Sequence, residues 1–492
     1  MKNRKKNSMK EKKIHSIKMI QIAYPMKLKR WIPVLMALFL WVGCTREVIV
    51  EVPVYVEKES AVKFTLYTTT FSNRAAQDHY GTFPLEAERR IFNYAILIFN
   101  VDNKLEAALI ANPYDPAVPG STGLDTDGYL PLYFTDENGE ETVVTLTSGQ
   151  KKIFALVNAP QPLWDEWVAM MPDEGKTLEN YQAYTLDVKS KGGLNYITGT
   201  SATPAGDERG FLMTSSDIET IYLEPTLENA VNIEVRVGRA MAKASVASSL
   251  QVNPRNLEQQ PNGELSDISY KIKNNPNEMY IIPSITDGYT YTPYFYTNSN
   301  PASLYFDSPG TLAGNYVPVS KQNALTQLYC MENGNRNPNS ENVTRVVIKG
   351  TYTPDVLYKA NGEDIFTGYH TGDDFWRIAE IVDGQRIYTD KYYGENPSAY
   401  LKEEQRLVHY INGETYYFLY LDRDEKEYAY PHNYTVKRNS YYNIDITKVS
   451  NAGEETENPG VDLPGPEPSD NSRITVSISI KEWDLIQGNG EL

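Results

Sequence analysis

The stretch Ile474–Ile486, ITVSISIKEWDLI, has the pattern of a half-buried β-strand with no companion strand beside it in the sequence. Ile474, Val476, Ile478 and Ile480 alternate with polar residues and therefore share one face of the strand. Burial of four such side chains contributes roughly 6–12 kcal/mol before the cost of ordering the strand. The stretch therefore needs a partner sheet, and the rest of the chain has to supply it.

The segment before this strand, Gly453–Ser472, contains four prolines and few apolar residues. Such a composition indicates an extended, semi-rigid spacer, which would span on the order of 60 Å. The terminal strand can thus reach a neighbouring molecule, or it can fold back as the last strand of its own domain. Its periodicity alone favours neither position.

The composition indicates a globular, β-rich protein with two domains after its ends are removed. The chain has 492 residues, of which 41% are hydrophobic and 12% aromatic, and its 37 tyrosines lie among short runs of Val, Ile, Thr and Tyr. Its first 44 residues hold 11 basic residues and one acid, which leaves 36 basic and 63 acidic residues, or a net charge of -27, for the remainder. This acidic body argues against nucleic-acid binding.

The N-terminus has the pattern of a targeting segment. From Met26 a basic start precedes the apolar run Trp31–Val42, which is too short to span a bilayer and ends just before Cys44. The run resembles a bacterial lipoprotein signal, residues 1–43, which is cleaved as Cys44 is lipidated, although Trp41 departs from the usual leucine. An ordinary buried cysteine is the alternative, and translation can begin at Met1 or Met26.

A second strand with the same pattern follows the signal. Val62, Phe64 and Leu66 share a face within Ala61–Phe71, and they match the apolar face of the terminal strand in spacing and chemistry. Two strands are therefore available for one kind of groove. Arg74-Ala75 follows in a small, polar segment that is expected to be exposed and open to a protease, although a surface arginine is more often simply solvated.

Further strands are predicted along the body of the chain. A buried strand is expected at Asn93–Val101, and a helix that packs on the sheet through Trp164 and Trp167 is expected at Leu163–Met171. The remaining predicted strands are Asn232–Val246, Asn342–Tyr352 and Ser440–Val449, together with two hairpins, Thr142–Thr147 with Lys152–Asn158 and Leu407–Ile411 with Tyr416–Leu421. The first domain is predicted to end near residue 247.

Residues with catalytic or metal-binding patterns are not found. The five histidines are scattered, and no nucleophile motif or phosphate loop appears, so the sequence predicts no catalytic residue, no cofactor and no metal site. Asp125 and Asp127 lack the other ligands of a calcium loop and are interpreted as a turn. Asp373 and Asp374 beside Trp376 are interpreted as surface acids.

Four motifs together resemble the fimbrillin family of Bacteroidales, most closely the shaft subunits of the short, Mfa1-type fimbriae of Porphyromonas. They are VRVGRAMAKASV at Val235–Val246, VKRNSYYNIDITKV at Val436–Val449, the Pro/Asp/Glu-rich spacer, and the terminal ITVSISIKEW with Trp483. The resemblance runs from Cys44 to Leu492 in architecture. It implies an all-β fold of two β-sandwich-like domains with minor helices and a C-terminal donor strand.

The resemblance also implies a route of assembly. The precursor would be an outer-membrane lipoprotein that an arginine-specific, trypsin-like cysteine protease cuts between Arg74 and Ala75, with Arg46 as a competing site. The terminal strand, with Ile474, Val476, Ile478, Ile480 and Trp483, would then fill the groove of the next copy. The partners would be other copies, related anchor and tip subunits, the protease, and the membrane through the lipid.

The segments that follow from this interpretation are 1–43 signal, 44–74 lipidated propeptide with the first strand, 75–247 and 248–450 as the two fimbrillin domains, 451–472 spacer, and 473–492 donor strand. The role expected is a structural fimbrial subunit on the cell surface that supports adhesion and biofilm formation and has no enzymatic activity. The alternative is a surface glycan-binding lipoprotein whose tyrosines and tryptophans form a sugar platform and whose tail is an ordinary strand.

Overall fold

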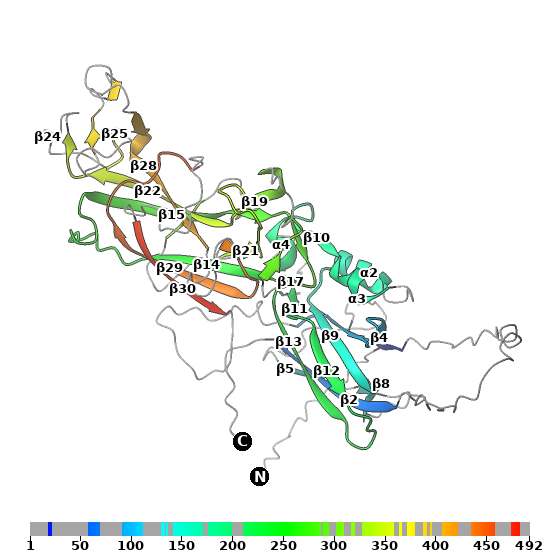
Figure 1. Cartoon of the computed structure of the whole chain (residues 1–492). Helices are drawn as coiled ribbons and strands as arrows, with labels where there is room; N and C mark the ends of the chain where they lie inside the picture. Colours follow the sequence, from blue (N-terminus) through cyan, green and yellow to red (C-terminus); the bar gives the residue numbers. More distant parts are fainter. Residues whose placement is uncertain are drawn as a thin grey trace, which may run out of the picture.

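A computed structural model gives the fold, and the residues that it describes are 18–21, 58–68, 91–111, 129–132, 134–135, 141–170, 176–198, 210–286, 289–294, 302–308, 316–319, 327–358, 364–366, 371–378, 387–390, 394–395, 406–421, 434–457 and 474–482. These residues are mostly strands with a few short helices, so the predicted all-β fold class is confirmed. The strands form two sandwich-like bodies, one at lower right and one at upper left in Figure 1.

The first body is built on one bent sheet with the order β1-β4-β3-β9-β11-β13-β2-β5, in which β12 also pairs with β9 and β8 with β2. Its strands are β1 (Lys18–Gln21), β2 (Glu59–Thr68), β3 (Tyr94–Phe99), β4 (Leu105–Ala111), β5 (Tyr129–Leu132), β8 (Val144–Thr147), β9 (Gly149–Val157), β11 (Met213–Thr214), β12 (Glu219–Leu223) and β13 (Val231–Arg239). β1, which lies inside the predicted signal, pairs antiparallel with β4.

β3 is a central strand with a hydrophobic core on each of its two faces. Its six residues are all buried. Ile96 and Ile98 join a core that also holds side chains of β2, β5, β8 and β13, so the β2 half of the sheet folds over the β3 half. Leu97 and Phe99 point the other way into a core shared with the helices. The prediction of a buried strand at Asn93–Val101 is therefore confirmed.

Three helices cover the outer face of β3, β4 and β9: α2 (Gln161–Met170), α3 (Leu178–Gln182) and α4 (Leu194–Thr198). Trp167 lies with its ring centroid 6.0 Å from that of Phe154 on β9 and 5.2 Å from that of Tyr181 on α3. Trp164 and Trp167 are both 1% exposed. The predicted helix and its packing against the sheet are confirmed, because aromatic residues at helical spacing supply the buried stripe.

The second body is a sandwich of two sheets around one core. One sheet has the order β21-β14-β29-β30 and the other the order β19-β15-β22-β28, with β20 paired to β15. The strands are β14 (Met241–Ser248), β15 (Gly263–Pro276), β19 (Tyr305–Ser308), β20 (Val317–Pro318), β21 (Gln327–Met331), β22 (Arg345–Pro354), β28 (Glu414–Tyr420), β29 (Ser440–Val449) and β30 (Ile474–Glu482). Cys330 is fully buried in this core, and burial raises the pKa of its thiol.

The chain passes between the bodies at Ala240. β13 ends at Arg239 in the first sheet, and β14 begins at Met241 in the second sandwich, where it runs parallel to β29. The change of sheet therefore lies seven residues before the boundary predicted near 247. Gly238 is the one residue near this break that interrupts the apolar pattern, and the sequence prediction took the two strands as a single segment.

Two fimbrillin-like motifs of the sequence meet at this junction. The Asn439 side chain accepts a hydrogen bond from the Arg239 amide at 3.1 Å, and a Cβ atom built on Gly238 would lie 2.6 Å from Asn439 Cγ. Gly238 thus allows the close approach of Asn439. Arg438 crosses the junction, because its guanidinium donates to Glu332 at 2.6 Å and to Thr214 of β11 at 3.0 Å.

The two predicted hairpins are wrong in their pairing, although their strands exist. β8 pairs with β2 and β9 with β3, so the turn at Ser148-Gly149 joins different halves of the bent sheet. Likewise β27 (Leu407–Tyr410) pairs with β25 (Phe375–Ile378), whereas β28 pairs with β22. Asn412 and Gly413 have the positive φ angles, 54° and 68°, of the predicted turn. The turn at Asn412-Gly413 therefore has the predicted backbone conformation. The strands on either side of both turns nevertheless pair with strands from elsewhere in the chain.

Small ladders and turns complete the fold. They are β6 (Phe134–Thr135) with β7 (Glu141–Thr142), β10 (Thr185–Asp187) with β16 (Glu278–Tyr280), β17 (Ser284–Thr286) with β18 (Tyr289–Tyr291), β23 (Leu357–Tyr358) with β24 (Asp364–Phe366), β26 (Tyr388–Thr389) with β25, and the 3-10 turns η1 (Ala302–Leu304) and η3 (Ile411–Gly413). Within the described part of the chain, no helix has the length and apolarity needed to cross a membrane.

Candidate assembly site

β2 fills a slot between strands that come from far along the chain. It runs parallel to β13 on one side, where Phe64 stands opposite Ile233, and antiparallel to β5 and β8 on the other. β2 thus has a main-chain partner on both edges, as a central strand does. Since none of these partners adjoins it in sequence, β2 is held in the sheet by non-local contacts.

The apolar face of β2 is a full part of the core. Val62, Phe64 and Leu66 are each at most 1% exposed, and they pack in the cluster formed with β3, β9 and β13. Burying three side chains of this size contributes roughly 5–9 kcal/mol before the cost of ordering the strand. The predicted common face of these three residues is confirmed, and taking β2 away would uncover an apolar floor.

Polar contacts line the opposite face of the slot. Thr65 Oγ1 donates to Asn232 Oδ1 at 3.2 Å, and the Tyr67 hydroxyl donates to Glu234 Oε1 at 3.4 Å. Arg236 bonds the other oxygen of Glu234 at 3.1 Å. Burial raises the pKa of Glu219 nearby, and Glu234 adds to this effect while Arg236 opposes it. Asn232, Glu234 and Arg236 thus give β13 one polar, partly charged face. The other face of β13 packs in the apolar core.

The link between β2 and the body falls outside the described residues. These end at Thr68 and resume at Ile91, so Arg74 and Ala75 lie in the gap. Cys44 and Arg46 also lie outside the described residues. The predicted lipidation and cleavage sites thus stay predictions, but both would lie on chain segments that flank β2.

The terminal strand lies on its own domain in this chain. β30 pairs antiparallel with β29, so that Ile478 stands opposite Ile444, Val476 opposite Ile446 and Ile480 opposite Tyr442. This is the second of the two predicted positions, the last strand of its own domain. Among the residues that the structure describes, β30 is the end strand of its sheet and pairs with β29 alone. Trp483 follows it outside the described residues.

The predicted spacer begins with residues that belong to the second sandwich. Glu454 exchanges two main-chain hydrogen bonds with Tyr416 of β28, at 2.7 and 2.8 Å. Ahead of it, the Tyr410 hydroxyl donates to the Gly453 carbonyl at 2.7 Å. We call Ser450–Glu457 the root segment. Residues 451–457 of the predicted spacer are therefore part of the second sandwich, and residues 458–473 lie outside the described residues.

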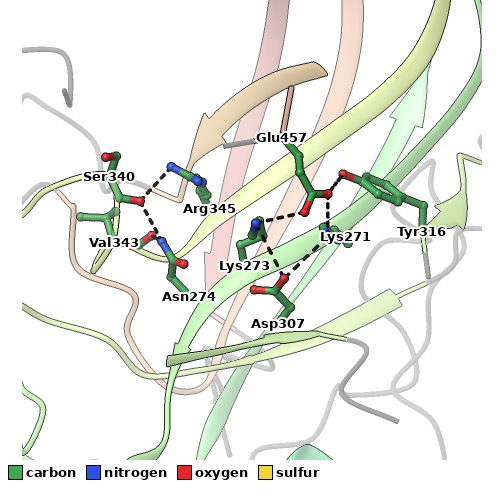
Figure 2. Close-up of polar contacts among 9 residues, drawn as sticks. All are labelled: Lys271, Lys273, Asn274, Asp307, Tyr316, Ser340, Val343, Arg345 and Glu457. Atoms are coloured by element: carbon green, nitrogen blue, oxygen red, sulfur yellow. Dashed lines mark hydrogen bonds and ion pairs between the residues drawn. The ribbon is translucent and has the colours of Figure 1, made fainter. Parts of the chain in front are cut away.

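Sequence reasoning missed the cluster that holds the end of the root segment. Lys271 and Lys273 of β15 lie against Glu457, and Tyr316 and Asp307 complete the group (Figure 2). The alternation Lys-Ile-Lys on β15 predicts exposed lysines, and Glu457 is 184 residues away from Lys273. No local signal in the sequence connects them.

The aromatic and acidic residues near Trp376 do not form an open platform. The Trp376 ring stacks on the His409 ring with centroids 4.1 Å apart, and Trp376 is 7% exposed. Asp374 contacts His409 Nε2 at 3.0 Å and accepts the Asn412 amide at 2.7 Å. Asp374 thus orders a turn, in agreement with its interpretation as a surface acid.

Comparison with known proteins places the terminal part of the chain in one class. Residues 408–489 match the family model described as "Major fimbrial subunit protein type IV, Fimbrillin, C-terminal". This region contains β28, β29, the root segment and β30. This terminal part of the chain is therefore similar to the C-terminal domain of fimbrillins. No curated protein matches this chain.

Several solved structures of low sequence identity are similar to the chain. A fimbrilin from Porphyromonas gingivalis is 13% identical, with a TM-score of 0.41 over 87% of this chain and 99% of that chain. The tip fimbrial protein Mfa3 from Porphyromonas gingivalis is 14% identical, with a TM-score of 0.39 over 86% and 100%. A candidate cell adhesion protein from Parabacteroides distasonis is 11% identical, with a TM-score of 0.46 over 87% and 99%. Similarity at this level carries no assignment of function.

Proposed function

We propose that this protein is a structural subunit of a fimbria and that it polymerises by exchange of strands between copies. In the proposal, cleavage after Arg74 releases β2 from the body, and the terminal strand Ile474–Glu482 of another copy enters the vacated slot. The subunit has no catalytic task. Its chemistry is the burial of an apolar strand and the pairing of main-chain groups.

The observation that carries the proposal is the difference between the two positions open to the terminal strand. Within the described part of the chain, β30 has one partner strand on its own domain, whereas β2 has a strand on each edge. A strand that moves from the first position to the second gains a second row of main-chain hydrogen bonds. Exchange is therefore favoured once the slot is empty.

The side chains of the two strands support the same exchange. Val476, Ile478 and Ile480 repeat at the spacing of Val62, Phe64 and Leu66. Because alternate side chains enter one face, a slot that accepts the second set also accepts the first. A shift by one residue would turn every apolar side chain away from the floor, so the register is well specified.

The proposed sequence of events gives β2 a protective task. While β2 is in place, the edges of β13 and β5 are paired and the core is covered, which prevents premature association during export. The precursor would travel as a lipoprotein through Cys44, reach the outer membrane, and meet an arginine-specific, trypsin-like cysteine protease. The resulting contact is head to tail and does not close, so copies add into a filament.

Within this proposal the chain acts as a shaft subunit of short, Mfa1-type fimbriae, with related anchor and tip subunits at the ends. The filament would support adhesion and biofilm formation at the cell surface. The match of residues 408–489 to the fimbrillin C-terminal model supports the role of a fimbrial subunit, because this region contains the strand that the proposal makes the donor, and it leaves a shaft or a tip position equally open.

Replacing Arg74 with Ala tests the proposal, with Arg46→Ala as the matched control. We expect Arg74→Ala protein to fold and stay monomeric, since β2 stays in its slot, whereas Arg46→Ala protein polymerises and begins at Ala75. N-terminal sequencing of surface-extracted protein and electron microscopy give the readouts. Filaments of normal length from Arg74→Ala protein, or an assembled subunit that begins at Glu47, would refute the proposal.

A further inference from the structure

Two buried lysines bind the last residue of the root segment. Lys271 Nζ lies 2.8 Å from Glu457 Oε2, and Lys273 Nζ lies 3.4 Å from Glu457 Oε1 (Figure 2). The side chains of Lys271 and Lys273 are 4% and 9% exposed. The Tyr316 hydroxyl donates a further hydrogen bond to Glu457 Oε2 at 2.8 Å. We call Lys271, Lys273, Tyr316 and Glu457 the anchor cluster.

Separating Glu457 from Lys271 and Lys273 would be energetically unfavourable because of their charges. Asp307 of β19 is the second acid of the group, but its Oδ2 lies farther from the two lysines, at 3.6 and 3.9 Å. Withdrawal of Glu457 would leave two buried ammonium groups with a weaker counter-charge. The Tyr316 ring centroid also lies 4.9 Å from Lys271 Nζ. The ammonium group of Lys271 therefore contacts both the Glu457 carboxylate and the face of the Tyr316 ring.

Several residues before Glu457 also bind the second sandwich. Gly453 donates its amide to Thr415 Oγ1 at 2.7 Å, and the Tyr417 hydroxyl donates to the Asn451 carbonyl at 2.9 Å. A Cβ atom on Gly453 would lie 2.0 Å from the Tyr416 carbonyl oxygen, so the chain passes β28 too closely for a side chain there. The root segment is thus part of the domain up to Glu457.

We propose that Glu457 is the anchor of the C-terminal arm, and that the exchangeable unit of this protein is residues 458–492 rather than the whole tail after β29. This inference rests on the proposed exchange of strands. Glu457 stays bound to Lys271 and Lys273 when β30 pairs with β29, and it stays bound when the arm occupies another copy. A pulling force along the filament would then act on the buried ion pairs of Glu457 with Lys271 and Lys273, and β29 would stay paired in its sheet.

The anchor also sets how far the arm reaches. The segment between Glu457 and Ile474 has fewer residues than the spacer predicted from the sequence, and an extended chain of its length would span on the order of 50 Å at about 3.1 Å per residue. A shorter tether raises the effective concentration of the arm at a site that it can reach. The anchor therefore favours the slot of a directly adjoining copy over more distant ones.

Glu457→Gln tests the anchor, because glutamine keeps the shape and removes the charge. Glu455→Gln is the matched control, since Glu455 is exposed and lies two residues earlier. In the monomer we expect hydrogen exchange of the root segment to be at least tenfold faster in Glu457→Gln than in the parent, and unchanged in Glu455→Gln. Gly453→Ala should release the same segment through steric contact alone.

The filament gives the second readout. Filaments of Glu457→Gln subunits should dissociate at lower denaturant concentration than those of the parent or of Glu455→Gln. Unchanged hydrogen exchange of the root segment in Glu457→Gln monomers would overturn the anchor. Because that measurement uses monomers, it is independent of polymerisation. A parent protein that never exchanges strands would refute the proposed function while leaving the root measurement intact.

Discussion

At the scale of single residues, the environment of Glu457 lowers the pKa of its carboxyl group. Burial by itself raises the pKa of Glu457, but hydrogen bonds from Lys271 and Tyr316 and the charge of Lys273 outweigh it and lower the pKa to about 2. The carboxylate is therefore favoured in the folded chain. Asp307, the other acid beside the lysines, faces them from β19.

This shift gives the anchor a defined dependence on pH. The pKa of Glu457 in the folded chain lies below the ordinary value of 4.5, so its contribution is complete above about pH 4.5 and is lost as the pH falls toward 2. We expect protection of the root segment to be constant from pH 8 to pH 5 and to fall at pH 3. Protection factors from hydrogen exchange at each pH measure this. Glu457→Gln should show no such fall, and equal pH dependence in both proteins would contradict the assignment.

Arg438 is the residue that joins the two domains most closely. Its guanidinium is 3% exposed, bonds Glu332, which is 4% exposed, and also donates to the Tyr280 carbonyl at 2.8 Å. Arg438→Met would leave the Glu332 carboxylate buried without this cation, at a cost of about 3–5 kcal/mol. The double variant Glu332→Gln/Arg438→Met should be less destabilised than the single one. Urea unfolding measures both, and a loss below about 1 kcal/mol in Arg438→Met would count against this role.

At the scale of elements, β30 and β2 are the two strands that have to change partners. Ile478→Asp puts a carboxylate in the middle of the apolar face of β30, and an unpaired carboxylate costs more to bury than a neutral polar group in either position. We expect the monomer to fold without β30 and to form no polymer. Thr475→Asp is the control, since Thr475 belongs to the polar face and stands opposite the exposed Lys448.

Gel filtration and electron microscopy of protein that begins at Ala75 decide this case. Polymerisation of Ile478→Asp as efficient as that of Thr475→Asp would show that the terminal strand is not the donor. Loss of the folded second domain in Ile478→Asp monomers would show that β30 is an integral strand of that domain. The edge position of β30, with its single partner, is the reason to expect neither result.

The elements also mark the limit of what sequence alone predicts. Strand positions such as Ser440–Val449 follow from period-two alternation, and the helix with Trp167 follows from helical spacing. Pairing does not follow, because the turns at Ser148-Gly149 and Asn412-Gly413 connect strands that find partners elsewhere. Burial of one face is decided locally, whereas the choice of neighbour depends on the whole sheet.

The same distinction holds for the candidate site. The apolar faces of β2 and β30 were visible in the sequence because alternation identifies a buried row. The anchor cluster was not visible, because ion pairs between Lys271 or Lys273 and Glu457 depend on how the root segment crosses β28. The home position of β30 on β29 was one of two open alternatives, since periodicity carries no information on which sheet a strand joins.

At the scale of the whole molecule, the two bodies and their ends divide the tasks of the proposed assembly. The first body holds the slot of β2, and the second holds the anchored arm (Figure 1). Shared packing across Ala240, with Met279 and Met331 of the second body in the helix core of the first, joins them firmly. Donor and acceptor thus lie on different bodies of one subunit, as a head-to-tail filament requires.

The proposed export route is tested at the start of the chain. Cys44→Ser should abolish lipid attachment and leave the precursor short of the outer membrane, because the Cys44 thiol would be the acceptor of the lipid in the proposed route. Metabolic labelling with a fatty acid, followed by membrane fractionation, measures both effects. Normal lipid labelling of Cys44→Ser protein would contradict the prediction.

The position of the terminal strand in the filament tests the central claim most directly. A photoreactive amino acid at Ile478, in a mixture of isotopically light and heavy subunits that begin at Ala75, reports which strand it contacts and in which copy. In monomers we expect cross-links to β29 of the same chain. In filaments we expect cross-links to β13, β5 or β8 of a different copy. Filaments whose Ile478 cross-links join only β29 of the same chain would contradict the exchange of strands.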